Sequence, residues 1–331
     1  EPRDQSRLMV VSRQDESVQH RHFFDLPEYL KFGDLLVFNE SRVFPAKLKG
    51  HLVNTGGTVE LLLLHSESPG IWNSLVRPGR RMRPGAIFEV ASETGHKITG
   101  EVVQVEPNGS RLIKLSDERH LFELGSVPLP PYIRKPLDNP DRYQTVYARD
   151  VGSVAAPTAG LHFTQKLLDK IRGAGVELAF VTLHVGWGSF RPVKVNEISD
   201  HQLYSERWEM NERSARSINN AHRDGRRVIS IGTTTVRLLE HAATVTSSEN
   251  SDSDQQDTIV SPGSGWADLF IYPGYKFRVI DGMVTNFHLP RSTLLMLTSA
   301  FTGRNKLLNA YAEAVTNTYR FYSFGDAMLI V

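Results

Sequence analysis

Residues 141–164 read DRYQTVYARDVGSVAAPTAGLHFT, and the segments before and after them have different sequence patterns. The stretch shows no apolar periodicity, but it is rich in small residues, among them Gly152, Ser153 and the run 155–160. Small side chains let the backbone come close to a ligand, and glycine permits turns that other residues resist. An ordinary connector between elements has the same composition, so both interpretations stay open at this point.

Two residues at the end of this stretch carry chemistry. His162 is a possible acid or base, because imidazole titrates near neutral pH. Thr164 is a good N-cap for the amphipathic segment QKLLDKIRGAG at 165–175. A loop that leads into a helix presents unpaired backbone N–H groups, which suit an anionic or polar ligand.

The segment before this stretch has the pattern of a small β domain. Residues 45–125 alternate short apolar runs with turns such as NTGG, RPG and PNG, which predicts an antiparallel β-barrel or sandwich. We expect a β-barrel domain at 45–125, inserted into a discontinuous α/β domain made of 1–44 and 126–331. The proline-rich SVPLPPYIRKPLDNP at 126–140 marks the return to that α/β domain.

After residue 160 the predicted strands and helices alternate, which is typical of an α/β layer architecture. VELAFVTLHVG at 176–186 is almost continuously apolar, as expected for a strand covered on both faces. Helices are predicted at 163–175, 211–225, 233–243, 292–303 and 305–317, and further strands at 226–232, 268–273, 277–281, 283–290 and 326–331. Residues 244–264 are polar and acidic, and we predict a mobile surface loop there.

The bulk composition excludes several classes of protein. The chain has 331 residues and a net charge of +1, and it contains no cysteine, so disulfides and thiolate nucleophiles are excluded. No apolar run approaches the roughly 18 residues of a membrane span and no signal-peptide pattern occurs, so we expect a cytoplasmic protein. No GxGxxG follows a predicted strand and no GxxxxGK[ST] occurs, which argues against the common nucleotide-binding loops. The chain begins at Glu1 without methionine, so its start is expected to be trimmed.

Arginines concentrate within the predicted β domain. The stretch RPGRRMRPG at 77–85 holds four of them: Arg77, Arg80, Arg81 and Arg83. A further arginine, Arg42, comes earlier in the chain. Such a cluster suits contacts to nucleic-acid phosphates. A charged hairpin edge that prevents strand pairing is the alternative interpretation.

Two strand ends carry polar groups. His184, Gly186 and Gly188 leave one predicted strand, and Thr233, Thr234 and Arg237 follow another. Ligands of α/β sheets gather at the carboxyl ends of strands, where hydroxyls and a guanidinium can hold ribose, carboxylate or phosphate oxygens. A strand-end histidine is also commonly just hydrogen-bonded, and Thr233 is equally a plain N-cap. We expect Glu240 to lie on the surface.

Aromatic and polar side chains also occur together near the end of the chain. Tyr272, Tyr275, Asn286 and His288 fit an unpaired RNA base, which can be stacked on a ring and read along its edge. A buried core fits this composition nearly as well. The spacing of His201 and Glu206 does not suit two metal ligands on one helix face, so no metal is expected.

Several of these stretches together resemble one enzyme family, the S-adenosylmethionine:tRNA ribosyltransferase-isomerases of queuosine biosynthesis. The matching stretches occur in the expected order and cover most of the chain: GDLLVFNESRVFPAKLKG, YQTVYA, GSVAAPTAGLHFT, HVGWGSFRPV, IGTTTVRLLE, FIYPGYKF and DGMVTNFHLPRSTLLMLTSAF. The resemblance implies transfer and isomerisation of the ribosyl group of S-adenosylmethionine to 7-aminomethyl-7-deazaguanine at the tRNA wobble position. The implied products are epoxyqueuosine in the tRNA, adenine and methionine.

The resemblance also assigns expected roles. His184 and His162 are the leading acid–base candidates, and His288 is the third. The expected S-adenosylmethionine contacts are Gly152, Ser153, Pro157, Thr158, Gly160, Gly186, Gly188, Thr233, Thr234 and Arg237. The expected tRNA contacts are Arg42, Arg77, Arg80, Arg81, Arg83, Arg191, Tyr272, Tyr275 and Asn286. We expect a monomer; an RNA methyltransferase and a non-catalytic tRNA-binding protein remain alternatives.

Overall fold

The computed structural model describes residues 2–92, 95–133, 135, 137–190, 193, 198, 203–249 and 258–331. The chain divides into two compact units. The sheet unit contains Glu1–Ser41, Asp141–Asp150 and Ala156–Val331, and the barrel unit contains Arg42–Pro140 and Val151–Ala155. The barrel unit therefore extends beyond the predicted insertion at 45–125 on both sides.

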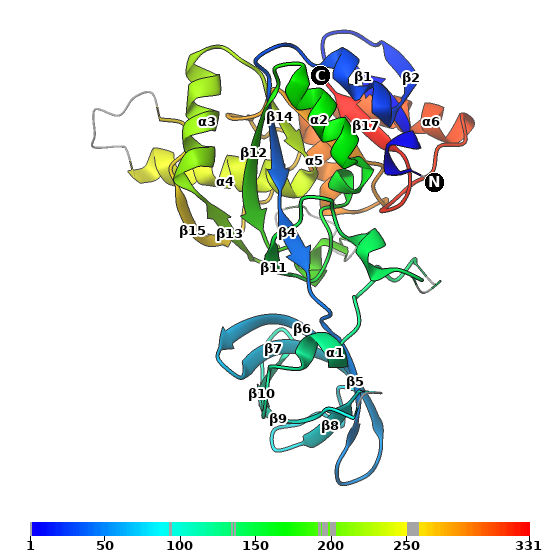
Figure 1. Ribbon diagram of the computed structural model, residues 1–331, viewed down its shortest axis with the longest axis vertical. Helices are drawn as coiled ribbons and strands as arrows, with labels where there is room; N and C mark the ends of the chain where they lie inside the picture. Colours follow the sequence, from blue (N-terminus) through cyan, green and yellow to red (C-terminus); the bar gives the residue numbers. More distant parts are fainter. Residues whose placement is uncertain are drawn as a thin grey trace. The chain divides into compact units, whose positions relative to one another are not determined.

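Within the described residues, the sheet unit is built on a nine-stranded sheet (Figure 1). Its order is β15 (Gly263–Ala267), β13 (Glu206–Met210), β12 (Glu177–Leu183), β3 (Leu35–Asn39), β14 (Val228–Ile231), β16 (Gly282–Asn286), β17 (Ala327–Ile330), β1 (Arg7–Val11) and β2 (Val18–His22). The four neighbours β12, β3, β14 and β16 run parallel, so their carboxyl ends lie along one edge. β1 pairs in parallel with β17, the last strand of the chain.

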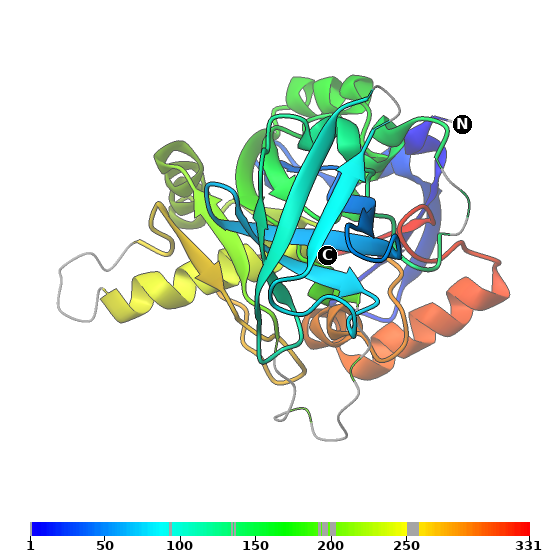
Figure 2. The same cartoon turned by 90° about the horizontal axis from the view of Figure 1, so that it is seen from below.

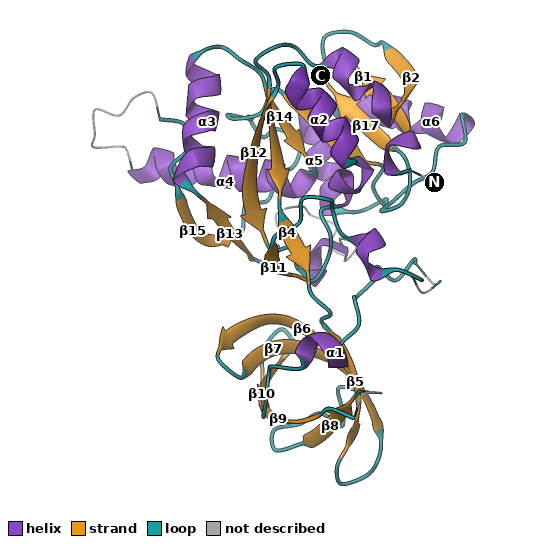
Figure 3. Ribbon diagram, in the orientation of Figure 1, coloured by secondary structure: helices purple, strands orange, loops and turns teal. Residues whose placement is uncertain are grey.

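Helices and 3-10 turns accompany this sheet (Figure 3). The helices are α2 (Gln165–Gly173), α3 (Glu212–Arg223), α4 (Thr233–Glu249), α5 (Thr293–Thr302) and α6 (Arg304–Thr316), and the 3-10 turns are η1 (Arg3–Gln5), η2 (Phe23–Tyr29), η3 (Pro140–Tyr143), η4 (Thr158–His162) and η5 (Trp187–Phe190). No helix among the described residues has both the length and the apolar character needed to cross a membrane.

Both faces of the central strand β3 are covered. Leu36 and Phe38 join residues of α2 in one buried cluster, whereas Asn39, on the opposite face of β3, contacts Thr234 at the start of α4. This two-sided burial explains why β3 and β12 read as nearly continuous apolar runs. The predicted N-cap at Thr164 is confirmed, since its hydroxyl accepts the Leu167 N–H at 3.1 Å.

The structure corrects three expectations about secondary structure. The predicted loop 244–264 is helical up to Glu249, because α4 continues through its first six residues, and Gly263 already belongs to β15. Residues 268–273 and 277–281 form no strand. The edge strand β2 was not predicted, because four of its five residues are exposed and no apolar alternation marks it.

The barrel unit contains the predicted closed antiparallel barrel (Figure 2). Its strand order is β10 (Arg111–Leu115), β7 (Ile71–Arg77), β6 (Thr58–Ser68), β5 (Lys47–Leu52), β8 (Ile87–Ala91) and β9 (Lys97–Val105). Buried residues alternate with exposed ones along β9, as expected when one face of each strand points into a filled interior. A short helix, α1 (Leu121–Leu124), follows β10, and β4 (Ser41–Val43) pairs with β11 (Asp150–Ser153) in a separate two-stranded sheet.

Candidate active site at the carboxyl edge of the sheet

The parallel strands bring the predicted strand-end residues to one edge. Phe38 of β3 lies level with Phe180 of β12 and with Ile231 of β14, and Ile231 lies level with Val284 of β16. His184, Thr233 and Asn286 therefore lie at or just beyond neighbouring strand ends. This edge is where α/β sheets bind ligands.

Asn39 connects three elements at this edge. Its amide nitrogen donates to the Leu183 carbonyl at 2.9 Å and to the Thr234 hydroxyl at 3.4 Å, and its carbonyl oxygen accepts the Leu183 N–H at 3.1 Å. Asn39 is fully buried and was not predicted as a site residue. A single amide at the end of the apolar run LLVFN is the signal that could have identified it.

His162 is held at both ring nitrogens. Nδ1 lies 2.7 Å from the Ser6 hydroxyl, and Nε2 accepts from the Asn286 amide nitrogen at 3.1 Å. Thr158 donates to the Asn286 carbonyl oxygen at 2.8 Å, so η4 is fixed to the end of β16. Burial lowers the pKa of His162 to about 4, so the imidazole is neutral at physiological pH.

His288 is also buried and engaged. Its Nε2 lies 2.7 Å from the Thr285 hydroxyl, and its backbone N–H donates to the Tyr311 hydroxyl at 2.8 Å. Burial lowers the pKa of His288 to about 4. Like His162, it is a neutral hydrogen-bonding group.

His184 differs from the other two histidines. Its Nδ1 atom is buried, and no described residue forms a hydrogen bond with it. The backbone N–H of His184 donates to the Arg207 carbonyl at 2.8 Å, which fixes the residue at the end of β12. Burial lowers the pKa of this imidazole, the charge of Arg207 adds to the effect, and Asp150 opposes it. Of these three histidines, His184 is the half-buried one, and its Nδ1 atom has no hydrogen-bond partner among the described residues.

The predicted ligand contact Arg237 has a protein partner. Its guanidinium donates to a Glu206 oxygen at 2.6 Å, and both side chains are buried. The other Glu206 oxygen accepts the Gly186 N–H at 2.8 Å, so one carboxylate joins the Gly186 loop to α4. Sequence patterns assigned Glu206 no role other than that of an unsuitable metal ligand. Its pairing with Arg237 could not be predicted, because the two residues lie 31 positions apart in the sequence.

The predicted cofactor loop 152–160 is divided between the two units. Gly152 and Ser153 lie in β11 and belong to the barrel unit, whereas Pro157, Thr158 and Gly160 belong to the sheet unit. A Cβ atom at Gly160 would overlap the Tyr147 hydroxyl, so this glycine makes room for a half-buried tyrosine. Similarly, a Cβ atom at Gly188 would lie 2.6 Å from the Tyr204 ring.

The expectation that Glu240 lies on the surface is wrong. Its carboxylate is fully buried and accepts the N–H groups of Arg278 and Val279 at 2.9 and 3.0 Å. The Tyr275 hydroxyl donates to it at 3.2 Å. Burial raises the pKa of Glu240 and, together with the Glu240 charge, raises that of Tyr275 to about 12. The N–H groups of Arg278 and Val279 therefore bond the Glu240 carboxylate instead of a neighbouring strand, as they would have done in the predicted strand at 277–281.

The other predicted tRNA contacts differ in exposure. Tyr272 is exposed, whereas Asn286 is buried and uses its amide on His162 and Thr158. In the barrel unit the four arginines Arg77, Arg80, Arg81 and Arg83 are exposed, and Arg42 is half-buried. Arg191 and His201 lie outside the described residues.

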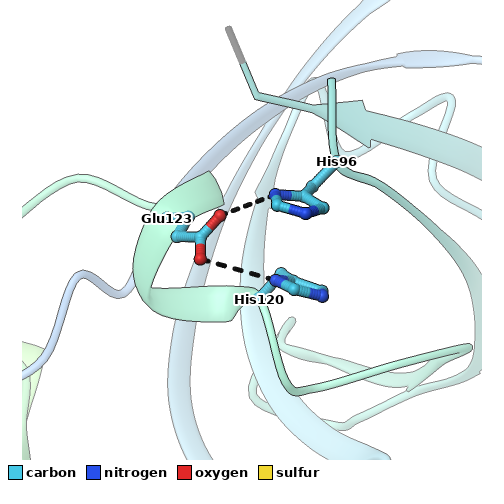
Figure 4. Close-up of side chains that lie close together, drawn as sticks. All are labelled: His96, His120 and Glu123. Carbon is cyan, nitrogen blue, oxygen red and sulfur yellow. Dashed lines mark ion pairs between the residues drawn. The ribbon is translucent and has the colours of Figure 1, made fainter. Parts of the chain in front are cut away.

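One group in the barrel unit has side chains that metals bind. His96, His120 and Glu123 place their ligand atoms within 4.8 Å of one another (Figure 4). The Glu123 carboxylate lies 2.7 Å from Nδ1 of His96 and 3.5 Å from Nδ1 of His120, and the two rings stack with centroids 3.9 Å apart. Two imidazoles and a carboxylate are zinc ligands elsewhere.

Comparison with known proteins matches nearly the whole chain. Residues 1–330 match a family model described as queuosine biosynthesis protein. The S-adenosylmethionine:tRNA ribosyltransferase-isomerase of Natranaerobius thermophilus is 50% identical, over 99% of this chain and 93% of its own length. The enzyme of the same name from Moorella thermoacetica is 51% identical, over 100% and 94%. A crystal structure of the S-adenosylmethionine tRNA ribosyltransferase from Thermotoga maritima is similar with a TM-score of 0.54 and 37% identity, over 100% of this chain and 94% of that one.

Proposed function

Because the chain belongs to the family of queuosine biosynthesis proteins, we propose that it is an S-adenosylmethionine:tRNA ribosyltransferase-isomerase. It transfers the ribosyl group of S-adenosylmethionine, with isomerisation, to 7-aminomethyl-7-deazaguanine at the wobble position of a tRNA. The products are epoxyqueuosine in the tRNA, adenine and methionine. The observation that carries this proposal is about 50% identity to enzymes of that name over nearly the whole chain.

The reaction sets three requirements for the site. A proton must leave the carbon next to the sulfonium, and the aminomethyl nitrogen must be deprotonated. The two substrates must be held together, and water must be excluded while adenine and methionine leave. A wobble base is already partly unstacked, so its presentation costs less than flipping a base out of a duplex.

We assign the base to His184. Its free Nδ1 atom lies at the carboxyl edge of the sheet, and its lowered pKa keeps the imidazole neutral and able to accept a proton at physiological pH. His162 and His288 become positioning residues, because both ring nitrogens of His162 and Nε2 of His288 are engaged by neighbouring side chains. His162 holds Asn286, and His288, just after β16, forms a hydrogen bond with Thr285 of that strand.

S-adenosylmethionine is assigned to the same edge. The first backbone N–H groups of α4, at Thr233 and Thr234, have no partner within the helix and suit ribose or carboxylate oxygens. The buried pair of Glu206 and Arg237 fixes the Gly186 loop against this helix rather than binding the ligand itself. No metal takes part in the proposed chemistry.

The tRNA contacts are assigned to exposed groups on both units. The four exposed arginines of the barrel unit neutralise backbone phosphates, and Tyr272 offers a ring for stacking. The protein acts as a cytoplasmic monomer in this proposal.

One assay separates this function from its alternatives. The protein is incubated with S-adenosylmethionine and tRNA that carries 7-aminomethyl-7-deazaguanine, and the small products are separated. Free adenine and methionine are expected. Release of S-adenosylhomocysteine would indicate a methyltransferase, and tRNA binding without any product would indicate a non-catalytic binder.

A further inference from the structure

A cavity of about 90 Å³ lies beside His162 in the sheet unit, and most of its polar lining has no assigned role. Guanidinium, hydroxyl and imidazole groups line it from segments far apart in the sequence: Arg3, Ser6, Arg142, His162, Arg320 and Ser323. Three arginines in a cavity of this size form a concentrated positive charge.

The arginines are only partly neutralised. Arg3 donates to the main-chain carbonyls of Gln144 and Asp141, which are uncharged acceptors. Arg320 pairs with Asp326 at 2.8 Å, but that carboxylate is shared with Arg7 at 3.2 Å. The Asp141 side chain offsets part of the charge on Arg3. Positive charge therefore exceeds negative charge around the cavity.

The like charges act on one another. Burial lowers the pKa of Arg3, and repulsion from Arg142 lowers it further. Burial has the largest effect on the pKa of His162 and lowers it; the charge of Asp326 opposes this effect, and the charges of Arg320 and Arg3 lower the pKa further. An anion in the cavity would relieve this repulsion and accept hydrogen bonds from the guanidiniums.

The size and sign of the cavity select the anion. A volume of about 90 Å³ is large enough for a single phosphate group. The methionine end of S-adenosylmethionine carries an ammonium beside its carboxylate, and three arginines would repel that ammonium. A phosphodiester carries no positive charge.

We propose that this cavity binds one backbone phosphate of the substrate tRNA, next to His162. The inference rests on the proposed function, because it takes tRNA as the substrate. A phosphate held here sets the register of the RNA on the sheet unit, since phosphate contacts position nucleic acid without reading its sequence.

Arg142 is the position to test, because it is exposed and lines the cavity, whereas Arg320 also fixes Asp326. Arg142→Gln is compared with Arg142→Lys, which keeps the charge, and with Arg216→Gln, which alters an exposed arginine of α3 outside the cavity. We expect Arg142→Gln to raise the Kd for tRNA roughly three- to tenfold and to reduce the slope of log Kd against log salt by about one. Arg142→Lys should restore most of the affinity, and Arg216→Gln should leave it unchanged.

A single-phosphate scan identifies the bound group. Anticodon stem-loop RNAs, each with one phosphate replaced by an uncharged methylphosphonate, are titrated against wild type and Arg142→Gln. One position is expected at which neutralisation weakens wild type but not the variant. If no position shows this coupling, or if Arg142→Gln raises only the KM for S-adenosylmethionine, the proposal is wrong. These are binding measurements, so a wild type that binds tRNA without releasing adenine would overturn the proposed reaction and not the phosphate site.

Discussion

The carboxylate of Glu206 and the guanidinium of Arg237 form a buried ion pair at 2.6 Å, directly behind the Gly186 loop. Two charges taken out of water are stable only while each has its partner. The pair therefore fixes the position of the loop that follows His184, and removing one charge affects both folding and the site.

Glu206→Gln should destabilise the protein strongly. It leaves the buried charge of Arg237 without a counter-charge, which costs about 3 to 5 kcal/mol in the free energy of unfolding. Urea denaturation measures this change. The control is Glu212→Gln, which breaks an exposed pair with Arg216 and should cost less than about 1 kcal/mol. Equal effects of the two substitutions would show that the buried pair is unimportant for folding.

His184→Ala should remove turnover and leave tRNA binding intact. Loss of a general base lowers the rate by about 100-fold or more. Adenine release measures turnover, and filter binding measures affinity for tRNA. His65→Ala, in an exposed pair with Glu67, is the control and should keep full activity. Full activity of His184→Ala would exclude His184 as the base.

Stability should fall as the pH decreases from about 6.5 to about 4. His162 and His288 have pKa values of about 4 in the folded protein, below the ordinary value of about 6.5, so the unfolded chain binds more protons in this window. Each histidine therefore contributes a stabilisation that is complete above pH 6.5 and lost as the pH approaches 4, at about 1.4 kcal/mol per pH unit.

Denaturation midpoints between pH 4 and 7 test this dependence. His288→Gln should flatten the pH profile of stability by one proton. An unchanged slope in His288→Gln would mean that His288 titrates normally in the folded protein.

Glu240→Ala should loosen the loop that carries Tyr275. The substitution removes the acceptor of the Arg278 and Val279 N–H groups, so these amides should exchange with solvent faster. Because Tyr272 lies just before this loop, the Kd for tRNA should rise as well, while the KM for S-adenosylmethionine stays the same. Hydrogen exchange read by mass spectrometry measures the loosening. Protection equal to wild type would show that other contacts hold the loop.

Removal of metal ions should not reduce turnover. Dialysis against a chelator is expected to leave adenine release unchanged, because no step of the proposed reaction uses a metal. Loss of activity that zinc restores would contradict this. His96→Ala then tests whether the group of His96, His120 and Glu123 is responsible.

The elements that could be predicted are those whose sequence signal lies within a few residues or repeats along the chain. The apolar run of β12, the N-cap at Thr164 and the glycine turns of the barrel all carry their signal within a few residues. The convergence of His184, Thr233 and Asn286 depends instead on the strand order that the structure shows. The parallel pairing of their strands places all three at one edge.

The missed features depend on partners distant in the sequence. Asn39 acts through Leu183, which lies 144 residues away, and Glu240 acts through backbone groups 38 and 39 residues away. No local pattern distinguishes a buried carboxylate from a solvated one on a helix. For the same reason the segment 277–281 read as a strand, although the Glu240 carboxylate takes two of its N–H groups.

The parallel pairing of β1 with β17 has a consequence for synthesis on the ribosome. In the sheet of the described residues, β2 pairs with β1, and β1 pairs with β17 (Ala327–Ile330), which connects both strands to the rest of the sheet. Residues 7–22 therefore stay unpaired with the rest of the sheet until β17 has been synthesised. A nascent chain stalled before residue 327 should keep this segment accessible to chaperones and proteases.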